Sequence, residues 1–79
     1  MDKTLDTDQG YQIRYSGGRL ADVVIDGVVV ECVQVRDYDF AGGTLGRMPT
    51  DEQIRRRVAQ FLRPEDMDEY RAQAAFYNR

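Results

Sequence analysis

The stretch that decides the fold is VVIDGVVVEC, which runs from Val23 to Cys32. At its centre, Asp26-Gly27 is a strong hairpin signal, because this dipeptide tolerates the positive φ angles that a tight type I′ turn requires. The flanking residues are mostly β-branched and aliphatic, as strands prefer. The stretch therefore predicts two antiparallel strands joined by a two-residue turn.

Pairing across this turn places two carboxylates opposite each other. The predicted register sets Asp22 directly across from Glu31, where like charges destabilise a sheet by about 0.2–1 kcal/mol. Because solubility can be obtained without such a pair, we interpret it as a functional feature. The same register pairs Ile25 with Val28, Val23 with Val30, and Ala21 with Cys32.

A third strand is expected before the hairpin, over residues 11–15, where apolar and polar side chains alternate. Ser16-Gly17-Gly18 then predicts a turn, with Gly18 in the left-handed conformation. A three-residue loop sets Ile13 opposite Ala21 and keeps apolar side chains together, whereas a two-residue loop would set Ile13 opposite Asp22. The pattern therefore predicts a three-stranded meander over residues 11–15, 19–25 and 28–36.

The two faces of this predicted sheet differ in character. The core face is expected to carry Tyr11, Ile13, Tyr15, Ala21, Val23, Ile25, Val28, Val30 and Cys32. The other face mixes charged and aliphatic residues: Gln12, Arg14, Leu20, Asp22, Val24, Val29, Glu31 and Val33. Beyond Cys32, Gln34 and Arg36 fall on the core side while Val33 and Val35 do not, so a bulge is expected nearby.

Two helices are predicted in the C-terminal half. Thr50 and Gln53 fit a capping box, and the apolar residues that follow share one helical face: Ile54, Val58, Phe61 and Leu62. Pro64 ends this helix and suits the first turn of the next. The apolar stripe of the second helix is expected to be Met67, Tyr70, Ala74 and Tyr77.

The predicted fold class is α+β, a three-stranded antiparallel β-meander with two C-terminal α-helices packed on one face. Residues 1–9 are expected to form a flexible acidic arm, and residues 10–79 a single domain. Within that domain we expect the sheet over about 11–40, a glycine-rich connector over 41–49, and helices over about 50–63 and 64–77.

Composition argues against catalysis and against cofactors. The 79 residues contain no histidine and one cysteine, with 11 basic and 14 acidic residues for a net charge of −3. Because the usual general base and the nitrogen ligands for zinc are absent, neither an enzyme nor a metal site is expected. A hydrolase that uses carboxylates alone is conceivable, but a sheet of this size hardly provides its cleft. The absence of a signal-like or membrane-spanning apolar run favours a cytoplasmic protein.

One basic cluster, Arg55–Arg57, offers an alternative function. Three consecutive helical residues fan across the helix, and two of them have acidic partners one turn earlier, so a solvated and paired helix face is expected. Direct nucleic-acid binding through these arginines is not expected, because phosphate contacts would have to overcome an acidic remainder. The glycine-rich residues 42–47 are interpreted as a connector, since they lack the ending of a phosphate-binding loop.

The acidic residues are the candidate partner-binding set. The primary group is Asp22, Asp26, Glu31, Asp37 and Asp39, and a second patch is Glu65, Asp66, Asp68 and Glu69. If these carboxylates converge, their spacing loosely resembles that of phosphates in a nucleic-acid duplex, at one charge per ~1.7 Å. Such a surface would compete for a groove lined by arginine and lysine, with association accelerated by complementary charge.

A short, acidic, histidine-free chain with no catalytic constellation resembles the small phage-encoded anti-CRISPR proteins of type I systems. The resemblance covers size and charge over the whole chain. It implies a stoichiometric inhibitor in the host cytoplasm that blocks target DNA binding by a CRISPR surveillance complex. The alternative is a non-catalytic adaptor that homodimerises through an edge strand or through the mixed aliphatic face, Leu20, Val24, Val29 and Val33.

Overall fold

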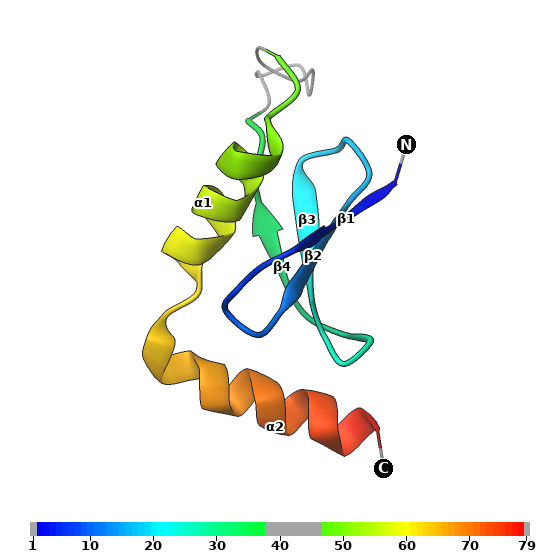
Figure 1. Cartoon of the computed structure of the whole chain (residues 1–79), viewed down its shortest axis with the longest axis vertical. Coiled ribbons are helices and arrows are strands. Elements are labelled where there is room, and N and C mark those ends of the chain that lie inside the picture. The colour runs from blue at the N-terminus through cyan, green and yellow to red at the C-terminus, as the bar shows by residue number, and fades with distance from the viewer. Residues whose placement is uncertain (1, 38–46, 79) are drawn as a thin grey trace.

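The computed structural model describes residues 2–37 and 47–78. The fold is α+β, with a four-stranded antiparallel sheet in the order β1-β2-β3-β4 and two C-terminal helices (Figure 1). The elements are β1 (Lys3–Asp6), β2 (Gln12–Tyr15), β3 (Leu20–Ile25), β4 (Val28–Gln34), α1 (Asp51–Phe61), η1 (Pro64–Asp66) and α2 (Met67–Tyr77). The sheet thus has one strand more than the sequence predicted.

The additional strand β1 lies in the segment that was expected to be a flexible arm. It pairs antiparallel with β2, and Leu5 lies opposite Ile13 with only 5% of its surface exposed. Lys3 at the start of the strand forms an ion pair with Asp51 of α1, 2.6 Å between Nζ and Oδ1. A single apolar residue among polar neighbours gives too weak a periodic signal, so backbone pairing and the burial of Leu5 decide this strand.

The pairing of β2 with β3 keeps the predicted faces but shifts the predicted register by two residues. Ile13 lies opposite Val23 and Tyr15 opposite Ala21, so the loop is longer than the three residues expected. The positive φ in this loop is at Gly17 (+99°) rather than at Gly18. The Tyr15 hydroxyl donates a hydrogen bond to the Gly18 carbonyl at 2.8 Å, which supports the longer loop. A shift by two preserves parity, so apolar residues remain opposite apolar residues.

The hairpin turn forms as predicted, but the register beyond it does not. Ile25 lies opposite Val28, and both turn residues have positive φ, Asp26 at 49° and Gly27 at 82°. The pairing then passes from Val24↔Val29 to Val23↔Glu31, so the extra residue of a β-bulge is Val30.

This bulge corrects several predictions at once. Every residue of β4 after it changes face, so Asp22 lies opposite Cys32 and not opposite Glu31. Cys32, which was expected in the core, is exposed, while Val33 and Val35 are buried. The broken alternation did indicate a bulge, and its extra residue Val30 lies two residues before Cys32, beyond which the pattern visibly fails.

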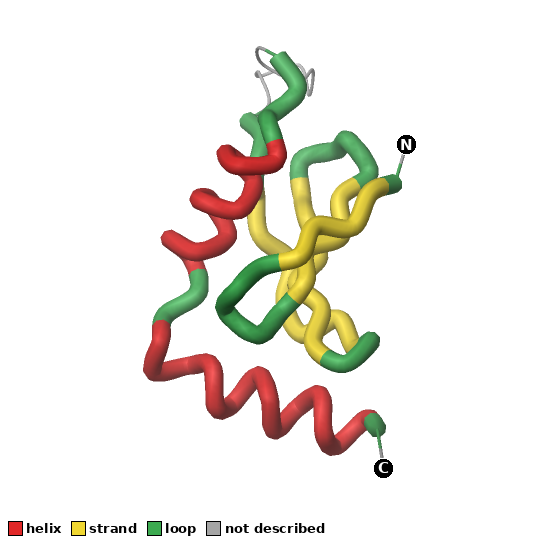
Figure 2. Tube along the Cα trace, in the orientation of Figure 1, coloured by secondary structure: helices red, strands yellow, loops and turns green. Residues whose placement is uncertain are grey.

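The helices close one side of the molecule. Both halves of the predicted capping box form at the start of α1, with Gln53 N donating to Thr50 Oγ1 at 3.2 Å and Thr50 N donating to Gln53 Oε1 at 2.9 Å. The two helices run in different directions, with α1 beside β4 and α2 across the end of the sheet, as the labels of Figure 1 and the trace of Figure 2 show. Asn78 donates to the Asp26 carbonyl at 3.1 Å and so fixes the end of α2 to the hairpin turn.

One apolar core joins the sheet to the helices. It contains Leu5, Tyr11, Ile13, Tyr15, Ala21, Val23, Ile25, Val33, Val35, Ile54, Val58, Leu62 and Ala74. Phe61 and Tyr77, which were expected on the buried helix faces, are 52% and 73% exposed. No helix in residues 2–37 and 47–78 has the length and apolar character needed to cross a bilayer.

Candidate partner-binding surfaces

The acidic residues predicted to converge do not share one face. Asp22 lies between the buried residues Ala21 and Val23, so strand alternation turns its side chain away from the core. Glu31 instead turns toward α2, where it accepts a hydrogen bond from the Tyr70 hydroxyl. The predicted opposition of Asp22 and Glu31 is therefore wrong, and a functional role for that pair loses its basis.

The remaining acidic residues are distributed over several elements. Asp26 occupies the hairpin turn, Asp37 pairs with Arg57, and Asp39 lies outside the described residues. Glu65 and Asp66 belong to η1, and Asp68 and Glu69 to the first turn of α2. Only part of this set is gathered in space.

The part that lies near Tyr70 is Glu31, which contacts its hydroxyl, with Asp66 and Glu69, whose charges act on it. The Tyr70 hydroxyl donates to Glu31 Oε2 at 3.1 Å, while Glu31 Oε1 accepts from the Cys32 amide at 3.0 Å. Burial, the hydrogen bond to Glu31 and the charges of Glu31, Asp66 and Glu69 all raise the pKa of Tyr70. Strand β4, η1 and α2 thus place three carboxylates, Glu31, Asp66 and Glu69, near enough to one phenol for their charges to act on it, and we call these three the Tyr70 acidic cluster.

An exposed apolar hollow adjoins this cluster. Val29, Phe76 and Tyr77 are 45%, 61% and 73% exposed, and they line a hollow of about 540 Å³ together with Ala72, Gln73 and Glu69. The Phe76 and Tyr77 rings meet edge to face at 5.6 Å. Glu69 belongs both to this α2 hollow and to the Tyr70 acidic cluster. Alternation along the strands did not point to the hollow, because its aromatic residues lie at the end of a helix.

Cys32 has an unfavourable environment for nucleophilic chemistry. Its thiol donates to Asp22 Oδ1 at 3.3 Å. That hydrogen bond, burial and the charges of Asp22 and Glu31 raise the pKa of Cys32. A raised pKa reduces the thiolate fraction, which is the reactive form.

The mixed aliphatic face predicted for an adaptor is also reduced by the bulge. Val33 belongs to the core and Val24 is buried, so only Leu20 and Val29 of the four predicted residues are exposed. Among the described residues, no group of three or more histidine, cysteine or acidic side chains is arranged to hold a metal ion.

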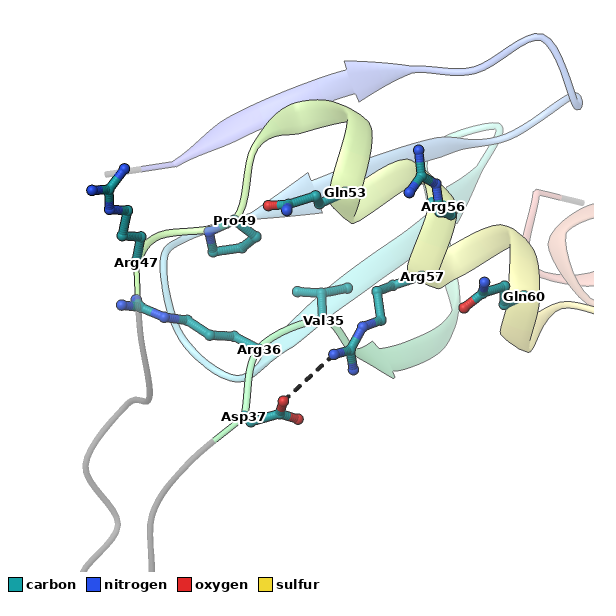
Figure 3. Close-up of a pocket in the computed structure, with 9 residues that line it drawn as sticks. All are labelled: Val35, Arg36, Asp37, Arg47, Pro49, Gln53, Arg56, Arg57 and Gln60. Atoms are coloured by element: carbon teal, nitrogen blue, oxygen red, sulfur yellow. Dashed lines mark hydrogen bonds and ion pairs between the residues drawn. The ribbon is translucent and has the colours of Figure 1, made fainter.

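Sequence reasoning missed a basic hollow beside α1. It measures about 390 Å³ and lies between the end of β4 and α1 (Figure 3). Four arginines line it, Arg36, Arg47, Arg56 and Arg57, and its other lining residues are Val35, Asp37, Pro49, Gln53 and Gln60. We call this the α1 basic hollow.

The arginine run of α1 divides as its helical spacing predicted. Arg55 turns away from the hollow and donates to the Asp6 carbonyl at 3.0 Å. Arg56 pairs with Glu52 at 3.2 Å, as expected, whereas Asp51 pairs with Lys3 instead of Arg55. The run Arg55–Arg57 was the one signal for this hollow, and Arg36 and Arg47 join it only through the tertiary fold.

Comparison with protein-family models, curated proteins and solved structures gave no match to this chain. The function must therefore be argued from the two surfaces alone.

Proposed function

We propose that this protein is a non-catalytic, stoichiometric inhibitor that binds a protein partner through the Tyr70 acidic cluster and the adjoining α2 hollow. The proposed partner is a basic nucleic-acid-binding groove of a type I CRISPR surveillance complex, reached in the host cytoplasm. Bound there, the inhibitor would exclude target DNA. This proposal keeps the acidic surface suggested by the sequence but moves its centre from Asp22 to Tyr70.

The position of Glu69 carries the proposal. Its side chain lines an exposed aromatic hollow, and its charge acts on Tyr70 together with the charges of Glu31 and Asp66. Protein interfaces place aromatic anchors inside a polar rim, so this arrangement suits a partner that is itself a protein. The carboxylates supply complementarity to arginine and lysine and accelerate association with a basic groove.

The Tyr70–Glu31 hydrogen bond supports the same function by preorganisation. It ties α2 to β4 and holds a carboxylate in place before binding, which reduces the entropy lost when a partner engages. The other oxygen of Glu31 is fixed by the Cys32 amide, so both carboxylate oxygens are positioned by the fold.

The test is inhibition of target DNA binding by a purified type I surveillance complex, measured by mobility shift with increasing inhibitor. Glu69→Lys should weaken inhibition about tenfold or more, since reversing a charge against a basic groove costs more than ~1.4 kcal/mol. Phe76→Ala should weaken it through loss of the aromatic anchor. Asp2→Lys is the matched control, because it changes the net charge equally from an exposed position just before β1 and outside the proposed surface.

Equal inhibition by Glu69→Lys and Asp2→Lys would refute the proposed surface. Inhibition that needs less than one inhibitor per complex would refute a stoichiometric mechanism. Failure of the unaltered protein to inhibit any type I complex tested would refute the proposed partner class.

A further inference from the structure

We propose that the α1 basic hollow is a binding site for phosphate groups. Four arginines line one concavity, and Asp37 is the one carboxylate among the described residues that line it. Guanidinium groups match phosphate oxygens in geometry and retain their charge at all physiological pH values. This site is separate from the surface proposed for the protein partner.

The arginines reach the hollow from three separate segments. Arg36 follows β4, Arg47 precedes α1, and Arg56 and Arg57 occupy the middle of α1 (Figure 3). Arg36 is held in place by its hydrogen bond to the Gly17 carbonyl, at 3.2 Å. In Figure 3, Arg57 is directed to Asp37 and Arg56 to the opposite side of α1, so a phosphate held by both requires one of these exposed side chains to turn.

The existing ion pairs in the hollow are weak competitors for a phosphate. Arg57 Nη2 lies 3.5 Å from Asp37 Oδ2, and both side chains are about half exposed. The Arg56–Glu52 pair is still more exposed. Exposed pairs of this kind contribute about 0–1 kcal/mol, so a phosphate with two or more arginine contacts can displace them.

The rest of the lining indicates how the ligand is recognised. Buried Val35 and Pro49 provide an apolar wall, and Gln53 and Gln60 offer neutral hydrogen-bond donors. Among the described residues that line the hollow none is aromatic, so this part of the chain provides no platform on which a base could stack. We therefore expect recognition of phosphate without selectivity for a base. The phosphate could belong to a single-stranded nucleic acid or to a small phosphorylated compound.

A salt titration distinguishes these two sources. Binding of a fluorescent oligothymidylate to the full chain is measured by anisotropy at stepped salt concentrations. Three to four phosphate contacts on a single strand give a slope of log K against log salt of about −2 to −3. Such a slope for oligothymidylate identifies a nucleic-acid backbone as the ligand. A slope near zero for oligothymidylate, together with saturable binding of inorganic pyrophosphate, identifies a small phosphorylated ligand.

A paired set of variants tests the location. Arg56→Ala with Arg57→Ala should reduce the slope by about 1.4, at 0.7 per lost contact, and should weaken binding of either probe. Arg63→Ala with Arg71→Ala changes the net charge equally outside the hollow and should leave binding nearly unchanged. An equal loss of binding affinity in the two double variants would overturn the proposal.

Chemical shifts of individual side chains distinguish binding in the hollow from a general effect of the protein's net charge. Titration with pyrophosphate or oligothymidylate should shift the NMR signals of the Gln53 and Gln60 side-chain amides. The side-chain amide signal of Gln73, in the α2 hollow, should stay unchanged. Absence of shifts at Gln53 and Gln60 with both probes at low salt would overturn the site.

Discussion

Replacement of Tyr70 by phenylalanine tests the interaction around which the acidic cluster is organised. The change removes only the hydroxyl that donates to Glu31 Oε2 at 3.1 Å. A hydrogen bond to a charged acceptor contributes about 1.5–3 kcal/mol when shielded, and Tyr70 is partly exposed, so we expect a loss of about 1 kcal/mol. For a domain of this size that corresponds to a decrease in Tm of about 4–8 °C.

The stability lost in Tyr70→Phe should depend on pH in a defined direction. The pKa of Tyr70 is raised above its ordinary value of 10.0, first by burial and then by Glu31. Above pH 10, the unfolded chain releases this proton while the folded chain retains it, so the stability contributed by Tyr70 falls as pH rises. The difference in free energy of unfolding between the wild type and Tyr70→Phe should therefore become smaller above pH 10. Tyr11, whose pKa is raised by burial and by Asp8, makes both proteins lose stability there.

The assay is urea denaturation followed by circular dichroism, with Tyr77→Phe as the matched control. That variant makes the same chemical change on the same helix, but at a residue that is 73% exposed. A double-mutant cycle with Glu31→Ala should give a coupling energy of about 0.5 kcal/mol or more. Equal stability losses in Tyr70→Phe and Tyr77→Phe, or a coupling energy near zero, would refute the preorganised cluster.

Three further changes test other parts of the fold. Ile54→Ala should destabilise the protein by about 2–5 kcal/mol in urea denaturation, because Ile54 is fully buried, whereas Phe61→Ala on the same helix should cost under about 1 kcal/mol. Similar losses from the two would contradict the packing of α1. Gly27→Ala should lower stability by about 1 kcal/mol because φ is +82° there, and an unchanged Tm would argue against the type I′ turn. Asp22→Asn should accelerate alkylation of Cys32 by iodoacetamide about twofold or more at mildly alkaline pH, since it removes the charge and weakens the hydrogen bond that raise the thiol pKa. An unchanged rate would show that Asp22 does not control the thiol.

The predicted opposition of Asp22 and Glu31 failed because of one residue, Val30. The pairing predicted from the turn was correct for Ile25 and Val28, but the bulge moved Glu31 to the helix side and Cys32 to the exposed side. A bulge changes the face of every later residue, and its position depends on which side chains the core accepts, so strand parity alone cannot locate it.

Local chemistry in the sequence determined the hairpin turn, the capping box of α1, the helix boundaries to within three residues, and most of the core face of β2 and β3. Those features depend on residues close together in the chain, so nearby side chains and backbone angles suffice to specify them. Only the tertiary structure decided that residues 3–6, with Leu5, form a fourth strand and that three carboxylates lie near enough to Tyr70 for their charges to act on it. It also decided that arginines from three segments line one hollow. The fourth strand depends on the burial of Leu5 against the core, whereas Tyr70 and Glu31 lie 39 positions apart and are brought together by the packing of α2 against β4.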